Sequence, residues 1–373
     1  MKQKNNTHRL CSLDTLRGFD MLFIMGGSMV LASLVNIFPN PFFEALAEQT
    51  RHVSWNGLHL EDCIFPLFLF IAGISFPFSL AKQRENGHTE SRIYIKIISR
   101  GLILVFLGII YNGLLKFDFD NLRYASVLGR IGLAWMFGAL IFMNTRATGR
   151  VLWTIGLLIG YYLLMRFWPL DRPEGVEWFD PDGTLERHLD MLYLPGQKAC
   201  GGGTYDPEGL LSTIPAIGTA LLGMMTGSFV KRGGALSDGP RKALLMIVAA
   251  VALLIIGLLW NELFPINKRV WTSSFVCVVG GISLMLFSLF YYVIDVKGLH
   301  GWTMFFRVIG LNSITIYMAQ KFISFRNTDE AIFGGLIRLL PENLQSTAGD
   351  LGYLMLCWLF LYFLYRQKIF LKV

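Results

Sequence analysis

The chain has 373 residues, of which 54% are hydrophobic and only 16% are charged, with a mean hydropathy of +0.50. Soluble globular domains carry about 25% charged residues, so this composition excludes an ordinary soluble protein. The net charge of +7 does not indicate a nucleic-acid partner, because Lys and Arg lie mainly at the ends of apolar segments. The five cysteines fit neither a disulfide framework nor a zinc site, so no metal is expected.

Apolar runs of about 20 residues, separated by short charged connections, predict an all-α polytopic transmembrane helix bundle. We expect about ten spans within a single domain over residues 1–373. The longest connection, 169–208, is predicted to be an outer loop that serves as a lid or binding segment, or else has no chemical role. The spans are expected at 13–36, 58–81, 92–115, 124–143, 150–168, 209–230, 241–263, 270–294, 302–324 and 348–367.

The distribution of Lys and Arg predicts an N-in/C-in orientation. If the N-terminus with Lys2, Lys4 and Arg9 is cytoplasmic, the inner connections carry more Lys and Arg than the outer ones. The outer connections also hold most of the acidic residues, including the run Asp171–Glu208. This orientation predicts that His52 lies on the outer, non-cytoplasmic face.

The stretch Arg51–Gly73, RHVSWNGLHLEDCIFPLFLFIAG, places a histidine at the mouth of the second span. An imidazole exchanges protons near neutral pH or accepts an acyl group, so His52 is the candidate catalytic residue. Trp55 is expected to shield it from water, Asn56 to orient a substrate, and Asp62 to lie in the first helical turn. We expect His52 and Asp62 to lie ~10–15 Å apart, framing one pocket without contact. The alternative is a histidine held by a backbone carbonyl at the membrane interface.

Three charged residues near the start of the first span, Asp14, Arg17 and Asp20, are costly within a membrane unless they are paired or hydrated. Asp14 and Arg17 have the i, i+3 spacing of a helical ion pair. Arg17 is a candidate phosphate ligand, because guanidinium binds phosphate in a bidentate manner. A purely structural salt bridge is the alternative.

Basic residues on the third and fourth spans form further candidates. Lys96 and Arg100 have i, i+4 spacing near an inner end and suit a phosphorylated cytosolic ligand, or Lys96 simply extends to the interface. Arg130 lies in an apolar stretch and is a functional candidate, or it neutralises Asp118 or Asp120.

The remaining candidates lie later in the chain. Asp206 and Glu208 precede the sixth span and either bind an amine or sugar hydroxyl, or cap the helix. Lys268 and its neighbour Arg269 precede a tryptophan, a pattern that also describes an ordinary interfacial collar. Asn312 lies between apolar residues and either contacts the substrate or joins two helices.

Five segments in this order resemble the heparan-alpha-glucosaminide N-acetyltransferase family of transmembrane acyltransferases, in a bacterial-type form. They cover residues 12–21, 52–73, 204–223, 266–275 and 295–317, and they read SLDTLRGFDM, HVSWNGLHLEDCIFPLFLFIAG, TYDPEGLLSTIPAIGTALLG, INKRVWTSSF and DVKGLHGWTMFFRVIGLNSITIY. The block around His52 is the most specific of the five.

The resemblance implies an acetyltransferase that takes acetyl from acetyl-CoA on the cytosolic side and delivers it to the amine of a glucosamine-type sugar across the membrane. The family's active-site histidine falls on His52. Arg17, Arg100 and Arg130 fall where the family carries basic residues. The family also has an asparagine near the end of its first core span, and this chain has the stretch 26–28, Gly-Gly-Ser, in its place.

The leading hypothesis is therefore an acetyl-CoA-dependent N-acetyltransferase in the bacterial inner membrane, with His52 on the periplasmic side. Expected partners are the lipid bilayer, acetyl-CoA, an amino-sugar or glycan acceptor and a second copy of the chain. An amino-sugar permease is the alternative, since Pro66 and Pro77 predict a broken second span like those of transporters. A scaffold without chemistry is the third.

Overall fold

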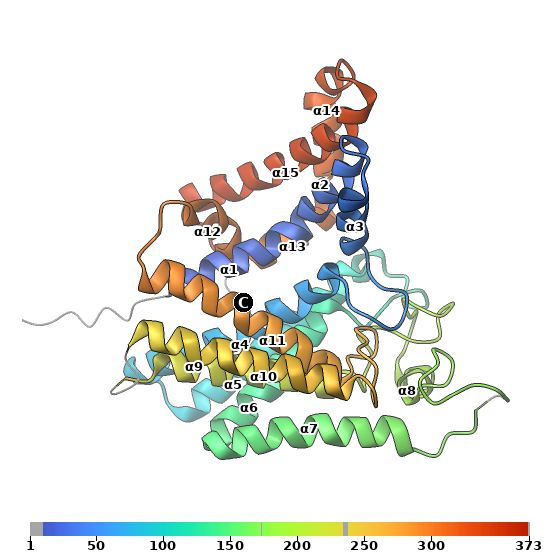
Figure 1. The fold of residues 1–373 in the computed structure, drawn as a ribbon, viewed down its shortest axis with the longest axis vertical. Helices are drawn as coiled ribbons and strands as arrows, with labels where there is room; N and C mark the ends of the chain where they lie inside the picture. Colours follow the sequence, from blue (N-terminus) through green and yellow to red (C-terminus); the bar gives the residue numbers. More distant parts are fainter. Residues whose placement is uncertain (1–9, 173, 234–237, 372–373) are drawn as a thin grey trace, which may run out of the picture.

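The computed structural model describes residues 10–172, 174–233 and 238–371. Lys2, Lys4 and Arg9, which entered the orientation count, lie outside the described residues. Within the described ranges the secondary structure is helical, with two isolated β-bridges and no strand, which confirms the all-α prediction. Figure 1 shows the arrangement of the helices.

Nine helical segments in the described part of the chain are long and apolar enough to cross a membrane. They are α1 with its continuations η1, α2 and η2 (Cys11–Leu22, Phe23–Gly27, Ser28–Ser33, Leu34–Asn36), α4 (Leu60–Glu85), α5 (Glu90–Tyr111), α6 (Val127–Asn144), α7 (Ala147–Phe167), α9 (Thr213–Lys231), α10 (Gly239–Trp260), α11 with η5 (Ser273–Phe290, Tyr291–Val296) and α15 (Glu342–Arg366). The shorter helices are α3 (Pro41–Gln49), η3 (Leu114–Lys116), α8 (Leu185–Tyr193), α12 (Thr303–Leu311), α13 (Ser313–Phe322) and α14 (Phe325–Ile337).

The segment predicted as the ninth span is two short helices, α12 and α13, which are separated at Asn312 (φ −128°, ψ 32°). At one end Thr303 lies beside Cys11, with 3.9 Å between their Oγ1 and Sγ atoms. At the other end the side-chain amide of Gln320 donates to the backbone oxygen of Met25 at 3.2 Å. The broken pair therefore runs alongside the first helical segment, and neither of its helices is long enough to be one of the nine candidate spans.

The predicted break at Pro66 and Pro77 is wrong, because α4 runs without interruption through both residues. Proline removes one backbone hydrogen bond, and neighbouring helices in a bundle make that loss tolerable. Both prolines are buried in this structure. The helical geometry is instead interrupted in the first segment, where Gly26 has a φ of +136°.

The helices form two groups. Helices α4 to α11 make one group, and the first segment together with α12 to α15 makes the other, so the two ends of the chain share a group (Figure 1). Close packing holds each group together: a Cβ added to Gly310 of α12 would lie 2.1 Å from the backbone oxygen of Asp14, and one added to Gly223 of α9 would lie 2.1 Å from that of Phe70. Glycine at both crossings lets the helix backbones approach.

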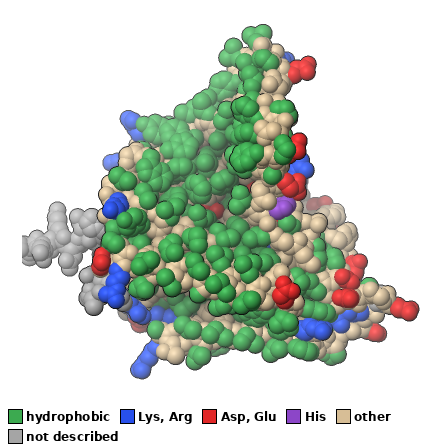
Figure 2. Space-filling view, viewed as in Figure 1, with side chains coloured by type: hydrophobic (Ala, Val, Ile, Leu, Met, Phe, Trp, Pro, Cys, Tyr) green, Lys and Arg blue, Asp and Glu red, His purple; other side chains and the backbone are tan. Residues whose placement is uncertain are grey.

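Hydrophobic side chains cover most of the face shown in Figure 2, as expected for a surface that meets lipid. Lys and Arg gather along the left-hand edge, whereas most Asp and Glu lie toward the right. The left-hand edge includes the start of α1 and the right-hand side includes α8 (Figure 1). The charge asymmetry expected from the sequence is therefore also present in space.

Candidate active site

His52 and Asp62 form a hydrogen-bonded pair at the start of α4. Asp62 lies in the first turn of the helix, and its carboxylate accepts from the backbone N–H of His59 (3.1 Å) and from Nδ1 of His52 (2.8 Å). The Asp62 side chain is 1% exposed, while that of His52 is 54% exposed. A buried carboxylate thus orients an imidazole that is open to a substrate.

The expected separation of ~10–15 Å between His52 and Asp62 is wrong. That distance assumed that the residues before α4 lead straight away from the helix. Instead they fold back over its first turn, where unpaired backbone N–H groups and the Asp62 carboxylate satisfy one another. The backbone N–H groups of Val53 (3.4 Å) and His59 both donate to Asp62, and this brings His52 into contact with it.

Lys268 completes the cluster from the loop between α10 and α11. Its Nζ lies 3.0 Å from Nδ1 and 3.3 Å from Nε2 of His52, and 3.4 Å from an oxygen of Asp62. Burial lowers the pKa of Lys268, and the nearby carboxylates of Asp62 and Glu208 only partly oppose this. Because Nδ1 of His52 donates to the Asp62 carboxylate, Nε2 is the ring nitrogen that keeps its lone pair.

Asn56 fixes the loop that carries His52 rather than extending into open space. Its side-chain oxygen accepts from the side-chain amide of Asn267 at 3.2 Å. One residue later, the backbone N–H of Gly57 donates to the backbone oxygen of Ile266 at 2.9 Å. Gly57 has a φ of +119°, a conformation that glycine adopts without strain. The His52 loop and the Lys268 loop are thus tied together.

Trp55 forms a wall between His52 and the long 169–208 connection. Its indole N–H donates to the backbone oxygen of Phe179 at 3.0 Å, and its ring packs against the rings of Phe179 and Tyr205. The long connection, which contains α8, therefore folds onto the candidate site. The structure brings these segments together although more than a hundred residues separate them.

Asp206 and Glu208 are both bound to Arg123, a residue that sequence reasoning missed. Nε and Nη2 of Arg123 each lie 2.6 Å from an Asp206 oxygen, and Nη2 also pairs with Glu208. Burial alone would raise the pKa of Asp206, but the Arg123 guanidinium holds it below its ordinary value. No local pattern marks Arg123, because its partners lie more than eighty residues away.

Arg130 lies apart from Arg17 and Arg100, the other two predicted donor ligands. Arg130 is 2% exposed, donates to the Ser212 hydroxyl and lies over the Trp271 ring at 5.1 Å. Its Nε and Nη1 have no hydrogen-bond partner among the described residues. It does not pair with Asp118 or Asp120; its charge instead acts on the buried carboxyl groups of Glu186 and Asp190 of α8.

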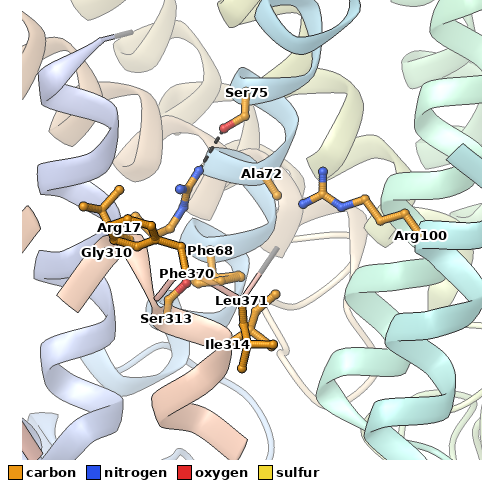
Figure 3. A pocket seen from close by; sticks show the side chains of 11 residues that line it. Arg17, Phe68, Ala72, Ser75, Arg100, Gly310, Ser313, Ile314, Phe370 and Leu371 are labelled. Atoms are coloured by element: carbon orange, nitrogen blue, oxygen red, sulfur yellow. Dashed lines mark hydrogen bonds between the residues drawn. The ribbon is translucent and has the colours of Figure 1, made fainter. Parts of the chain in front are cut away.

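Arg17 lines a cavity of about 340 Å³ between the two groups of helices (Figure 3). Its guanidinium donates to the Ser75 hydroxyl at 2.9 Å and lies 3.5 Å from an oxygen of Asp14, which confirms the predicted ion pair. The cavity lies between α1, α4, α5 and the junction of α12 with α13.

Arg100 extends into the same cavity from the opposite side, from α5 (Figure 3). Its guanidinium lies 4.4 Å from the centre of the Trp135 ring, and its Nε has no hydrogen-bond partner within the described ranges. Lys96, one turn earlier, is instead 3.0 Å from a ring nitrogen of His88. The structure thus brings Arg17 and Arg100 together across one cavity and leaves Lys96 outside it.

A narrow gap of about 30 Å³ continues from this cavity toward the His52 end. The two spaces share Phe68, Ser313 and Ile314, and the gap reaches Tyr317. Tyr317 stacks on Tyr111 with ring centres 4.6 Å apart. It also interacts with the charges of Glu208 and Arg123, and the Glu208 charge in turn acts on Lys268. An apolar constriction therefore separates the arginine cavity from the histidine cluster.

Asn312 does not lie beside His52. Its side chain is 1% exposed at the junction of α12 and α13, where it donates to the backbone oxygen of Ile369 (3.0 Å) and accepts from the backbone N–H of Leu371 (3.3 Å). Phe370 and Leu371 consequently line the arginine cavity. Asn312 thus fixes a segment that follows α15 against that cavity.

Ser28, at the position where the family asparagine is expected, donates to the Glu61 carboxylate at 2.6 Å. Glu61 immediately precedes Asp62 on α4. Within residues 10–172, 174–233 and 238–371, no group of three or more His, Cys, Asp or Glu side chains could hold a metal ion.

Fold and site together define a polytopic helical membrane protein with an oriented histidine at one end and an arginine-lined cavity at the other. A family model described as "Domain of unknown function (DUF5009)" matches residues 9–114, which include Arg17, His52, Asp62 and Arg100. Heparan-alpha-glucosaminide N-acetyltransferase from Homo sapiens is 28% identical over 98% of this chain, and that from Mus musculus is 26% identical over 100% of it.

The chain spans 60% and 61% of the length of these two relatives. The match covers essentially all of this chain, so the resemblance to the heparan-alpha-glucosaminide N-acetyltransferases that its motifs indicated is confirmed.

Proposed function

We propose that the chain is a membrane-bound acetyltransferase that moves acetyl from cytosolic acetyl-CoA to the amine of a glucosamine-type sugar on the outer side of the membrane. The observation that carries the proposal is the contact of the exposed His52 imidazole with the buried Asp62 carboxylate at 2.8 Å. This arrangement holds one ring nitrogen as a donor and leaves the other free to take a proton or an acyl group.

In the general-base route, Nε2 of His52 takes a proton from the acceptor ammonium. The neutral amine nitrogen then attacks the thioester carbonyl, a C–N bond forms and the C–S bond breaks. The imidazolium gives its proton to the leaving thiolate, and the new amide nitrogen loses its second proton to solvent. In the carrier route, Nε2 attacks the thioester first, an N–C bond forms, the C–S bond breaks, and the thiolate leaves and takes a proton from solvent. In a second step the neutral acceptor amine attacks the acetyl-imidazole, the Nε2–C bond breaks, and the amide nitrogen loses its extra proton to Nε2. Asp62 stabilises the positively charged imidazole in both routes.

Lys268 affects either route because its charged amine lies beside the His52 ring. Its Nζ lies 3.0 Å from Nδ1 and 3.3 Å from Nε2 of His52, close to the position that an acceptor amine has to reach. We therefore expect Lys268 to move aside or to exchange with the acceptor. Burial lowers the pKa of Lys268, which reduces the penalty of that exchange.

Arg17 and Arg100 are the proposed ligands for the phosphates of acetyl-CoA. They face one another across a cavity of about 340 Å³, and planar guanidinium groups suit phosphate oxygens. The gap beyond Phe68 and Ile314 is the proposed route of the thioester toward His52. At about 30 Å³ it is too small for a pantetheine arm, so we expect the two groups of helices to separate during turnover.

The acceptor side is proposed to include Trp55 and Glu208. Trp55 offers an aromatic face of the kind that stacks on sugar rings, and Glu208, whose charge acts on Lys268, offers a carboxylate for an ammonium or hydroxyl group. Asp206 and Arg123 are proposed to hold Glu208 in place. Arg130, which does not line the arginine cavity, is proposed to support the same outer region rather than the donor.

The proposal includes an N-in/C-in orientation in a bacterial inner membrane, with the donor cavity on the cytoplasmic side. It also includes function as a single domain, alone or as a homodimer. The concentration of Lys and Arg at the donor end and of Asp and Glu at the other end supports this orientation.

The test is transfer of labelled acetyl from acetyl-CoA to glucosamine by purified protein. We expect His52→Ala to lower the rate at least a hundredfold, because it removes the only proposed base. The matched control is His188→Ala, which removes an exposed histidine on α8 at the same end of the molecule. Labelled acetyl bound to protein without an acceptor would indicate the carrier route. Equal activity of His52→Ala and wild type would refute the assignment.

One structural observation favours the permease alternative: the pair of helices α12 and α13 is broken at Asn312, as helices at transporter binding sites are. A permease would carry labelled glucosamine into sealed vesicles in the absence of acetyl-CoA. The proposed enzyme requires acetyl-CoA and leaves its product on the acceptor side.

A further inference from the structure

A second cavity, of about 210 Å³, lies beside the histidine cluster and is distinct from the arginine cavity. It lies between the first helical segment with α3 on one side and α4 with α11 on the other. Most of its lining is apolar and comes from these residues: Phe19, Phe23, Leu31, Leu46, Leu60 and Ile282. Its polar groups gather around two carboxylates, Asp20 and Glu61.

Asp20 is 1% exposed, and one of its carboxylate oxygens has no hydrogen-bond partner in the described part of the chain. Glu61 interacts unfavourably with it through its own charge and accepts a hydrogen bond from Ser28 at 2.6 Å. No Lys or Arg is among the described residues that line this cavity. Two carboxylates in an apolar space whose described lining has no Lys or Arg are unfavourable, and a cation bound between them would stabilise both.

The position of the cavity links it to the reaction. Glu61 precedes Asp62, the residue that orients His52, and the Glu61 charge acts on Lys268. Thr50, which also lines the cavity, lies two residues before His52. A molecule held there is next to the candidate catalytic group.

We propose that this cavity binds an amphiphilic primary amine, with its ammonium group between Asp20 and Glu61 and its apolar part along the leucine and phenylalanine lining. Resting on the proposed function, this makes the acceptor an amino sugar that carries an apolar aglycone, held beside His52 before transfer. Free glucosamine lacks the apolar part and binds weakly. Ser28 assists by holding Glu61 toward the cavity.

The experiment measures direct binding without acetyl-CoA, with the protein in nanodiscs made of phosphatidylglycerol and phosphatidylcholine. The probe is labelled dodecyl 2-amino-2-deoxyglucoside. Two comparison ligands test the ammonium group and the dodecyl chain separately. The N-acetylated analogue keeps the chain but has no ammonium, and glucosamine keeps the ammonium but has no chain. We expect the N-acetylated analogue to bind about tenfold more weakly or worse, and glucosamine roughly a hundredfold more weakly.

Two variants remove one charge each, Asp20→Asn and Glu61→Gln, and each is expected to weaken probe binding about tenfold or more. The matched control is Glu44→Gln, which removes an exposed carboxylate from α3, the helix that covers the cavity. It should bind the probe as the wild type does. Ile282→Trp, which fills the apolar part, should weaken the probe but leave glucosamine unchanged.

Equal binding of the probe by wild type, Asp20→Asn and Glu61→Gln would overturn the inference, and so would equal binding of the N-acetylated analogue. Loss of probe binding when phosphatidylethanolamine is added to the nanodiscs would assign the cavity to a membrane lipid instead. The two proposals fail separately: binding without any acetyl transfer rejects the acetyltransferase, whereas transfer to glucosamine with unchanged probe binding in both variants rejects this cavity as the acceptor site.

Discussion

Asp62→Asn is the change that most directly tests the proposed chemistry. An amide has nearly the shape of a carboxylate but carries no charge, and its nitrogen donates rather than accepts. The bond from Nδ1 of His52 at 2.8 Å then has to reverse, with the amide donating to Nδ1. The imidazole proton moves to Nε2, so the nitrogen that faces the substrate can no longer act as a base.

The expected loss in kcat is about 10²- to 10⁴-fold, the range seen when the carboxylate that orients a catalytic histidine is replaced by an amide. Loss of the Asp62 charge also removes an interaction that raises the pKa of Lys268, so burial lowers that pKa further. The fold should survive, because the amide oxygen still accepts from the backbone N–H groups of Val53 and His59. We expect a change in unfolding free energy within about 2 kcal/mol.

The assay is steady-state acetyl transfer with kcat and KM measured separately for acetyl-CoA. A positioning role predicts a lower kcat with an unchanged KM for the donor, since Arg17 and Arg100 lie in a separate cavity. Asp171→Asn, the same change at an exposed position in the long outer connection, is the matched control and should be neutral.

The effect must also disappear in a His52→Ala background, because Asp62 acts through the imidazole. Activity of Asp62→Asn within about threefold of wild type would refute the proposed role of the pair. An equal loss in the presence and absence of His52 would show that Asp62 acts on something else.

Three further predictions concern the fold that supports the site. Burial and the neighbouring Asp190 raise the pKa of Glu186, so the folded state keeps this proton above about pH 4 while the unfolded state loses it, and stability falls as pH rises through this window. Glu186→Gln should therefore raise the melting temperature at pH 7 and flatten its decline with pH, and an unchanged melting curve would contradict this. Gly310→Ala should destabilise the protein by about 2 kcal/mol or more in a denaturation experiment, because the added Cβ meets backbone 2.1 Å away, whereas Gly156→Ala on α7, with open space around it, should be neutral or stabilising. Arg123→Met should leave two carboxylates without their partner, cost about 3 kcal/mol and increase hydrogen exchange in residues 196–209; unchanged exchange there would show that the ion pairs do not hold this segment.

Much of the architecture could be predicted from the sequence, because apolar length alone decides whether a segment spans a membrane. The first eight expected spans and the tenth correspond to the nine long apolar helices among the described residues. The interruption at Asn312 could not be predicted in the same way, since its cause lies in contacts with Ile369 and Leu371 far along the chain. The proline rule failed for α4 for the same kind of reason, because packing around Pro66 and Pro77 outweighs the local preference.

The sequence by itself singled out His52, Asp62, Arg17 and Arg100, because a titratable or charged residue beside an apolar segment is unfavourable without a purpose. Tertiary structure decided which of these residues meet. The chain folds back over the first turn of α4, so His52 and Asp62 form a hydrogen bond although the sequence predicted that they lie apart. Lys268 joins them from a loop more than two hundred residues away. The boundary between two groups of helices, where all three cavities lie, exists only after residues from both ends of the chain pack together, so no local sequence pattern encodes it.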